Sequence, residues 1–458
     1  MFWGFAPGGH EGRDGELSER IGRAVPGPEG STRMSDARLP YLDLGQPPRE
    51  DDLLCAYRVE PAQGVSLHAA SNALAAESSI GTWTGVAALT PALREKLRAR
   101  VLTIEGSMAL IAYGAELFEG GNMAQIFSSV AGNIFGMKDV ARLRLEAVRF
   151  PGTLVKSFPG PARGIEGIRE ALGIRGRPLV GTIVKPKIGL DPEAQAAVVY
   201  EAMAAGCDVV KDDENLTSQA FCPFEARLAA CLDATKRAED VTGCAKGYIP
   251  NVTAPTEIML RRAAQVAHMG GKIAMVDLVT AGWSGVQSLR GADLGLILHG
   301  HRAMHAAFTR LLDHGIAMEV MARAARLCGV DQLHVGTGVG KMAGGVEEVR
   351  RCAAALTSSP AEPGEGVGGQ DWRGVRPAMP IASGGLHPGH IPAVVSIFGK
   401  DVIMQFGGGI HGHPGGTAAG ARAARQALEA ALAGVPLEEF ALGAVELSAA
   451  LERWQAKA

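Results

Sequence analysis

The sequence predicts an α/β protein with a C-terminal TIM (β/α)8 barrel, preceded by a smaller α+β domain of the ferredoxin-like kind. Eight short apolar runs recur between residues 179 and 409, and each is followed by polar residues or glycine. Helix-like segments separate these runs, which is the repeat of a parallel barrel. A doubly wound sheet is the alternative fold, but it rarely needs eight such units.

The first 157 residues divide into two parts by composition. Residues 1–39 are rich in glycine, proline and charge, which predicts a disordered N-terminal tail, and Met34 is an alternative candidate for the native start. Residues 40–157 predict the N-terminal α+β domain. Within it, LLCAYRVEP (53–61) and ALIAYGAEL (109–117) are typical of strands, and VSLHAASNALAAES (65–78) is typical of a helix.

Residues 158–458 form the predicted barrel domain with its C-terminal helices. The eight strand segments with their polar ends span 179–187, 207–214, 247–255, 272–282, 294–303, 332–341, 379–385 and 402–409. Helices are expected at 191–206, 223–240 and 389–399, and again in the Ala-rich stretches 417–434 and 445–455.

Composition narrows the class of protein. The 458 residues are 47% hydrophobic and 20% charged, and the net charge of −3 argues against a nucleic-acid or membrane surface. The seven cysteines include no CxxC pair, so a disulfide scaffold and a thiolate zinc site are disfavoured. With no long apolar stretch and no signal-peptide pattern, a cytoplasmic location is expected.

The stretch KDDENLTSQAF (211–221) places a lysine beside acids at the end of an expected strand. Asp213 and Glu214 have the hard oxygen ligands that Mg2+ prefers. An ammonium has no lone pair, so Lys211 as it stands cannot be a ligand. Asp212 should point away, because neighbouring strand residues alternate faces. A solvated loop with a local ion pair is the alternative interpretation.

The other strand ends supply mainly cationic and glycine-rich groups. They are Lys185, Lys187, Asn251, His299, His301, Arg302, His334, Lys341, Ser383, Gly384, Gly385, Gly407 and Gly408. Taken singly, a glycine pair is usually a turn and a histidine is usually a core or surface group. Together they predict a barrel mouth suited to phosphate, and two phosphate sites on opposite sides of a metal would fit a small bisphosphate.

Several separate motifs make the interpretation specific. They are ESSIGTWT (77–84), GNIFG (132–136), KPKIGL (185–190), KDDE (211–214), HGHRAMH (299–305), HVGTGVGK (334–341), SGG (383–385) and QFGGG (405–409). In order and spacing, from about residue 40 to beyond 430, the sequence resembles the large subunit of ribulose-1,5-bisphosphate carboxylase/oxygenase (RuBisCO). GTIVKPKIGL, KMAGG and the lack of a plant-like C-terminal tail resemble the archaeal-type form III branch.

The resemblance implies a Mg2+-dependent carboxylation of ribulose 1,5-bisphosphate to two 3-phosphoglycerates, with O2 as a competing substrate. It implies that Lys211 reacts with an activator CO2, and that the carbamate holds Mg2+ with Asp213 and Glu214 and removes the C3 proton. Lys185 would transfer protons with support from Lys187. The resemblance also implies that His301 assists near C3 and that Lys341 closes over the site and stabilises the new carboxylate.

The same resemblance implies the phosphate contacts and the assembly. One phosphate would contact Thr82, Trp83, Gly385, Gly407, Gly408 and Lys341, and Gly384 would also belong to the substrate-binding residues. The other would meet Arg302 and His334, with Ser383 near the sugar hydroxyls. Glu77, Thr82, Trp83 and Asn133 would reach the site from a second subunit, so a homodimer or a ring of dimers is expected, without a small subunit.

Two positions depart from the family, and two rival functions stay open. Ile183 stands where plant enzymes have threonine, and Ala343 stands where a glutamate is common. One rival is a RuBisCO-like enolase or isomerase of sulfur salvage, which would replace several substrate-handling residues. The other is a non-enzymatic sugar-phosphate binder, in which the metal cluster and Lys341 would be free to vary.

Overall fold

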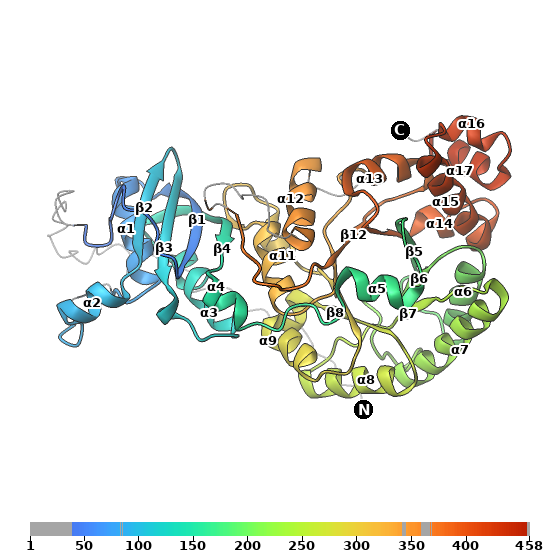
Figure 1. Ribbon diagram of the computed structural model, residues 1–458, viewed down its shortest axis with the longest axis horizontal. Coiled ribbons are helices and arrows are strands. Elements are labelled where there is room, and N and C mark those ends of the chain that lie inside the picture. Colours follow the sequence, from blue (N-terminus) through green and yellow to red (C-terminus); the bar gives the residue numbers. More distant parts are fainter. Residues whose placement is uncertain are drawn as a thin grey trace, which may run out of the picture. The chain divides into compact units, whose positions relative to one another are not determined.

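Figure 1 shows a computed structural model of the chain, which describes residues 39–82, 84, 86–340, 345–358, 367 and 369–455. The predicted tail up to residue 38 lies outside the described residues, as do Trp83, Lys341 and Ala343. Within the described part, no helix combines the length and the apolar character needed to cross a membrane.

The N-terminal domain is built on an antiparallel sheet in the order β4-β1-β3-β2. Its strands are β1 (Asp52–Pro61), β2 (Arg100–Glu105), β3 (Met108–Gly114) and β4 (Val140–Arg149), and its helices are α1 (Leu67–Glu77), α2 (Pro91–Leu97) and α3 (Met123–Val130). With α1 and α2 between β1 and β2, and α3 between β3 and β4, this is the expected ferredoxin-like arrangement with one additional helix. Ser66 starts α1, because its hydroxyl accepts a hydrogen bond from the backbone N–H of Ala69.

A fifth strand joins this sheet from the barrel half of the chain. The two-residue strand β10 (Gly315–Ile316) pairs parallel with the outer edge of β4. The sheet is therefore mixed, a feature that the sequence did not predict. The pairing fixes this part of the barrel half against the N-terminal domain.

The C-terminal domain is the predicted eight-stranded parallel barrel, with strand order β7-β6-β5-β13-β12-β11-β9-β8. The strands are β5 (Leu179–Ile183), β6 (Val209–Lys211), β7 (Gly247–Ile249), β8 (Ile273–Asp277), β9 (Ile297–His301), β11 (Gln332–His334), β12 (Met379–Ser383) and β13 (Ile403–Phe406). A parallel bridge between Asn251 and Met275 joins β7 to β8 and closes the barrel. All eight strand segments expected from the sequence are present.

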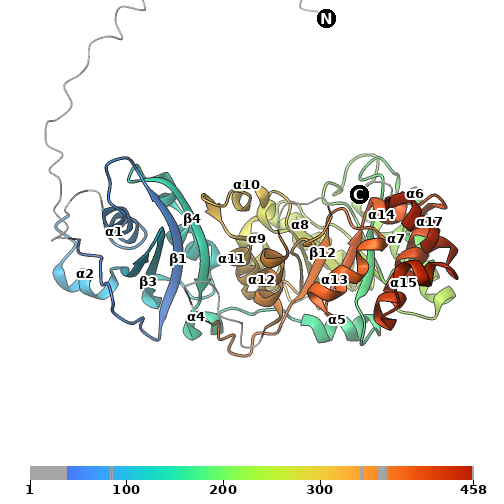
Figure 2. The ribbon, with the colours of Figure 1, turned by 90° about the horizontal axis from the view of Figure 1, so that it is seen from above.

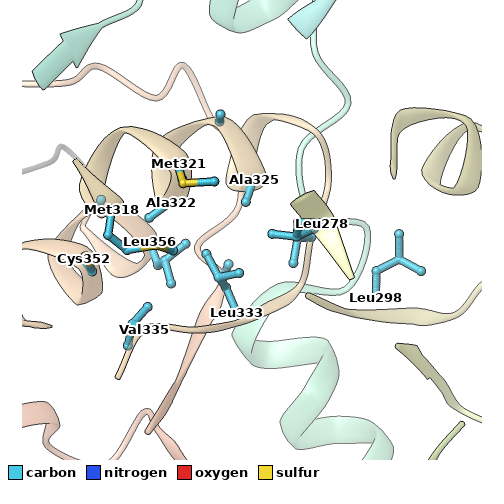
Figure 3. Close-up of a cluster of buried hydrophobic side chains, with 14 of the residues drawn as sticks. Leu278, Leu298, Met318, Met321, Ala322, Ala325, Leu333, Val335, Cys352 and Leu356 are labelled. Carbon is cyan, nitrogen blue, oxygen red and sulfur yellow. The ribbon is translucent and has the colours of Figure 1, made fainter. Parts of the chain in front are cut away.

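Helices on the outside of the barrel bury its outer face, as the two views in Figures 1 and 2 show. They are α6 (Pro192–Ala204), α7 (Phe224–Thr242), α8 (Thr256–His268), α9 (Leu278–Gly291), α11 (Met318–Leu327), α12 (Val346–Thr357), α13 (Ile391–Phe398) and α15 (Gly416–Ala433). Shorter helices and the last one are α4 (Gly152–Lys156), α5 (Gly164–Leu172), α10 (Ala306–Thr309), α14 (Gly408–His411), α16 (Leu437–Ala441) and α17 (Val445–Gln455). Figure 3 shows part of this outer core, where Met318, Met321 and Leu356 gather near Leu333 and Val335.

The barrel interior changes from apolar to polar along its axis. Its lower layer is a buried cluster that includes Leu179, Val209, Ile273, Ile381 and Ile403, together with residues of α5. Because side chains two apart on a strand share a face, the next inward position on β6, β9 and β13 is Lys211, His299 and Gln405. The apolar layer thus supports a polar floor below the carboxyl ends of the strands.

Candidate active site

A cavity of about 640 Å3 opens at the carboxyl ends of the barrel strands. Its lining includes thirteen of the predicted site residues: Lys185, Lys187, Lys211, Asp213, Glu214, His301, Arg302, His334, Ser383, Gly384, Gly385, Gly407 and Gly408. In a parallel barrel these ends converge on one face, which explains why residues more than 200 positions apart meet here.

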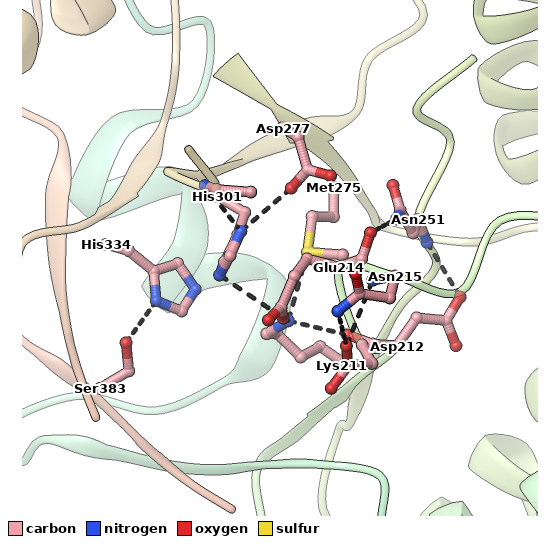
Figure 4. Close-up of polar contacts among 12 residues, drawn as sticks. Lys211, Asp212, Glu214, Asn215, Asn251, Met275, Asp277, His301, His334 and Ser383 are labelled. Atoms are coloured by element: carbon pink, nitrogen blue, oxygen red, sulfur yellow. Dashed lines mark hydrogen bonds and ion pairs between the residues drawn. The ribbon is translucent and has the colours of Figure 1, made fainter. Parts of the chain in front are cut away.

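Lysines neutralise the acid cluster on one wall of the cavity. The Lys185 amine lies 2.8 Å from a carboxylate oxygen of Asp213. The Lys211 amine lies 3.7 Å from a carboxylate oxygen of Glu214, and both residues are labelled in Figure 4. Lys211 also donates to the backbone carbonyl of Asp212 at 2.8 Å. Asn215 holds the second oxygen of Asp213 through its backbone and side-chain N–H groups. The two carboxylates therefore face the cavity in fixed positions.

Asp212 points away from the cavity, as strand alternation predicted. Its carboxylate is fully buried and pairs with the buried Arg227 at 3.1 Å. It also accepts hydrogen bonds from Tyr248, Gln195 and the backbone of Asn251. Asp212 thus anchors the strand end that carries its neighbours.

Burial lowers the pKa of the Lys211 amine below its usual value, and this effect outweighs the nearby carboxylates. Glu214, Asp213 and Asp277 act in the opposite direction, and Lys185 contributes a smaller lowering. Lys187 is not among the causes, since it is exposed at the rim and has no hydrogen-bond or ion-pair partner in the described part of the chain.

His301 is held by two carboxylates. Its Nδ1 lies 3.0 Å from Asp277, and its Nε2 lies 3.6 Å from Glu214. Asp277 is the last residue of β8, so its side chain points to the same barrel mouth. The sequence analysis missed Asp277, although an acid directly after the apolar run KIAMV was the signal that could have found it.

His334 lies between two hydrogen-bonding partners. Its Nδ1 is 2.6 Å from the Ser383 hydroxyl and its Nε2 is 2.8 Å from the Nε2 of His299. Burial lowers the pKa of both histidines well below the usual value, so both rings are neutral. Figure 4 shows the contact between His334 and Ser383.

Arg302 is a buried cation that has no anionic partner among the described residues. Its guanidinium lines the cavity, and the described residues include no hydrogen-bond or ion-pair acceptor for it. A Cβ built on Gly336 would come within 2.9 Å of this guanidinium, so glycine is needed for their close approach. A buried, unpaired cation facing a cavity is suited to an anionic ligand.

Glycine ends of β12 and β13 form the opposite wall. Gly384 and Gly385 have positive φ angles of 124° and 74°, which only glycine adopts readily. Gly407 lies beside Lys185, since a Cβ built there would be 3.4 Å from the lysine Cε. Exposed backbone beside a cationic side chain is suited to a second anionic group.

The cavity does not include the predicted residues of the N-terminal domain. Glu77 and Asn133 contact each other at 3.5 Å and line a separate pocket of about 630 Å3. The Thr82 hydroxyl donates to the backbone carbonyl of Thr84. Trp83 and Lys341 lie outside the described residues. One chain therefore presents these two groups of residues at two different places.

Other lining residues were not predicted. Gln405 is 1% exposed, and both polar atoms of its amide have no partner within the described part of the chain. His387 and Trp454 also line the cavity, with their rings stacked at 5.5 Å. QFGGG could have drawn attention to Gln405, whereas the approach of α17 to the mouth is a tertiary feature.

The described residues contain no group of three or more His, Cys, Asp or Glu side chains arranged to bind a metal ion. Asp213 and Glu214 supply two hard oxygen ligands, and the third member of this cluster is Lys211. A cation site here would need an additional oxygen ligand.

Comparison with known proteins gives matches along nearly the whole described chain. Residues 40–154 match the N-terminal domain of the ribulose bisphosphate carboxylase large chain, and residues 164–454 match its catalytic domain. A ribulose bisphosphate carboxylase of Methanosarcina acetivorans is 50% identical, over 92% of this chain and 100% of that protein. One from Methanocaldococcus jannaschii is 47% identical, over 91% of this chain and 100% of that protein.

Solved structures agree with the sequence matches. A dimeric archaeal Rubisco from Hyperthermus butylicus superposes with a TM-score of 0.86 at 46% identity, covering 91% of this chain and 99% of that one. An octameric Rubisco from Pyrococcus horikoshii, solved with sulfate, has a TM-score of 0.86 at 45% identity, covering 92% and 97%.

Proposed function

The chain belongs to the ribulose bisphosphate carboxylase large-chain family, of the archaeal type, and from this membership we propose that it carboxylates ribulose 1,5-bisphosphate to two 3-phosphoglycerates. The enzyme class is EC 4.1.1.39. O2 is the expected competing substrate. One observation carries the proposal: thirteen of the residues that the family resemblance assigns to the site line a single cavity at the barrel mouth.

We propose that Asp213, Glu214 and a carbamate on Lys211 hold Mg2+. The donor set supports this, because the site has two carboxylates and a carbamate formed on the Lys211 nitrogen would add a third anionic oxygen ligand. The lowered pKa of Lys211 favours the neutral amine, the form that reacts with CO2. When bound, Mg2+ supplies a Lewis acid that stabilises negative charge developing on substrate oxygens.

Proton transfer is assigned to groups around this cluster. Lys185 lies next to Asp213, where its ammonium can deliver a proton to a substrate carbon. Asp277 fixes the His301 ring through Nδ1, which directs Nε2 toward the acid cluster. Lys341 is assigned by family resemblance to closure over the new carboxylate.

A bisphosphate would span the cavity from Arg302 to the glycine wall, which is the backbone at the ends of β12 and β13. The buried, unpaired Arg302 guanidinium supports one phosphate site, with His334 and Ser383 beside it. The backbone at Gly384, Gly385, Gly407 and Gly408, next to Lys185, supports the other.

We propose a homodimer as the minimum active unit. Glu77 and Asn133 line a pocket separate from the barrel mouth, which supports their action on the site of a second copy. The Hyperthermus relative is described as dimeric and the Pyrococcus relative as octameric, and both states are compatible with a dimer as the building unit.

Incorporation of labelled CO2 into acid-stable product tests the proposal. Purified protein would be incubated with bicarbonate and Mg2+ and then given ribulose 1,5-bisphosphate without O2. Label is expected from the wild type and not from Lys211→Met. Lys246→Met is the matched control, because Lys246 is also buried but lies before β7 at the opposite end of the barrel, where its amine donates to Cys207.

Absence of label from folded, dimeric wild type would contradict the proposal. An enolase or isomerase of sulfur salvage would then be the leading alternative.

A further inference from the structure

Four polar groups form a continuous hydrogen-bonded chain below and beside the cavity. The amide oxygen of Gln332 is 3.1 Å from His299 Nδ1, and His299 Nε2 is 2.8 Å from His334 Nε2. His334 Nδ1 is then 2.6 Å from the Ser383 hydroxyl. Ser383 is the member expected near the sugar hydroxyls, whereas Gln332 and His299 lie beneath the mouth and do not line the cavity.

Three members of this chain are shielded from solvent. Gln332 and His299 are fully buried, and His334 is 2% exposed. Ser383 is partly exposed and lines the cavity. Bulk water therefore cannot substitute for a missing donor or acceptor along the buried part of the chain.

Each histidine carries a single ring proton. A neutral imidazole has one N–H donor and one bare nitrogen acceptor. The two rings share one hydrogen bond through their Nε2 atoms, which requires one Nε2 to be protonated and the other bare. Burial supports this neutral state for both rings.

The amide oxygen of Gln332, the first member of the hydrogen-bonded series, determines which atom donates in each of the following hydrogen bonds. The Gln332 oxygen can only accept, so His299 is protonated on Nδ1 and bare on Nε2. His334 must then donate from Nε2, which leaves its Nδ1 bare. Ser383 consequently donates its proton to His334, and its lone pairs face the cavity.

The opposite orientation of the Gln332 amide would reverse all of these roles. The Gln332 NH2 would then donate to His299 Nδ1, and the proton of each histidine would lie on the other ring nitrogen. Ser383 would accept from His334 and present its O–H to the cavity. The described orientation leaves the Gln332 Nε2 buried and without a partner in the described residues. The amide is thus the one group that selects between two self-consistent chains.

We propose that Gln332 is a positioning residue that fixes His299 and His334 in single tautomers, so that Ser383 acts as a hydrogen-bond acceptor toward the substrate. This inference rests on the proposed function for the identity of the substrate. A sugar hydroxyl can donate to Ser383, whereas a carbonyl or ether oxygen at that place cannot. The hydrogen-bonded series therefore favours binding of a substrate whose segment next to the Arg302 phosphate site carries hydroxyl groups.

Nitrogen NMR of the wild-type protein labelled with 15N-histidine tests the tautomers directly. His334 should be protonated on Nε2 and bare on Nδ1, and His299 should show the reverse, with assignments taken from signals lost in single histidine variants. The opposite pattern, or doubly protonated rings, would overturn the inference. This measurement needs neither substrate nor a Gln332 variant.

Kinetics test whether Gln332 acts through Ser383. Gln332→Met should raise the KM for ribulose 1,5-bisphosphate by about three- to tenfold, the value of one hydrogen bond, with a smaller change in kcat. In a Ser383→Ala background the same substitution should add nothing further to KM. Additive effects of the two substitutions would refute coupling through the chain.

Gln370→Met is the matched control. Gln370 is equally buried, but its amide bonds to the backbone of Phe150 and Asp371 away from the cavity. It should lower thermal stability like Gln332→Met and leave KM unchanged. If wild type fails to carboxylate, the proposed function fails while the tautomer measurement still decides this inference. If wild type carboxylates with reversed tautomers, only this inference fails.

Discussion

Lys211 illustrates how burial changes the chemistry of a single residue. Its amine is 1% exposed and lies among three carboxylates, which favour the ammonium form, yet desolvation dominates and lowers its pKa. The neutral amine is the nucleophile that CO2 requires. In the proposed activation, the reactive form of Lys211 is therefore favoured by the fold itself, before Mg2+ binds.

The first prediction concerns the pH dependence of this activation. Because deprotonation produces the reactive form, carbamate formation should rise with pH through the lowered pKa of Lys211 and then level off. Glu214 is the largest influence that raises this pKa, so Glu214→Gln should shift the rise to lower pH. The carbamate signal of 13C-labelled CO2, followed against pH without Mg2+, measures the shift.

Glu193→Gln is the control for that shift, since Glu193 is exposed on α6. A profile that moves to higher pH in Glu214→Gln would contradict the prediction.

The second prediction concerns the buried pair of Asp212 and Arg227. Asp212→Asn leaves the guanidinium buried without its counter-charge and should cost about 3–5 kcal/mol of unfolding free energy. Asp233→Asn breaks an exposed pair with Arg237 on α7 and should cost less than about 1 kcal/mol. Denaturant unfolding measures both, and equal losses would show that the buried pair has no special role.

At the scale of elements, close helix contacts position the glycine wall. α14 starts directly after Gly407 and packs against α15, where a Cβ on Gly420 would lie 2.1 Å from the carbonyl oxygen of Ile410. Such an approach is possible only without a side chain. The position of α15 thus determines where the end of β13 meets the cavity.

The third prediction follows from this contact. Gly420→Ala should destabilise the protein by about 1–3 kcal/mol through overpacking and should raise the KM for the bisphosphate, because α14 must shift. Gly291→Ala, at the open end of α9, should leave both quantities nearly unchanged. Thermal melts and steady-state kinetics are the measurements, and an unchanged KM in Gly420→Ala would refute the link between α15 and the site.

At the scale of the whole molecule, one chain carries two incomplete parts of the proposed site. The barrel mouth has the lysines, acids, histidines and glycines, whereas Glu77 and Asn133 line a pocket of the N-terminal domain. Isologous pairing of two chains would place each N-terminal domain at the barrel of its partner. Activity should then depend on assembly.

The fourth prediction is intersubunit complementation. Lys211→Met and Asn133→Ala should each be nearly inactive alone. Their co-expression should restore about a quarter of the wild-type sites, because half of the dimers are mixed and each mixed dimer has one intact site. Labelled CO2 incorporation measures the recovery. No recovery from verified mixed dimers would contradict a shared site, and co-expression of Lys211→Met with Lys185→Met, both in the barrel, is the matched negative control.

The sequence predicted the regular part of the fold because strand and helix periodicities are local. All eight barrel strands, the elements β1, α1 and β3 of the N-terminal domain and the direction of Asp212 follow from patterns within a few residues. The sequence did not predict strand β10, because two residues are too few to show a periodic pattern. Its pairing with β4 also depends on contact between residues more than 160 positions apart. The sequence did not predict a role for Gln332, because the role that we infer depends on its contact with His299 in the folded protein.

The sequence by itself determined which chemical groups stand at the strand ends, and in which order, since residue identity and strand polarity are properties of the chain. Only the tertiary structure decided how those groups behave. It lowered the pKa of Lys211 by burial, left Arg302 without a counter-ion among the described residues, and linked Gln332 to Ser383 through two histidines. These properties depend on solvent exclusion and on contacts between distant residues, and no local pattern contains either.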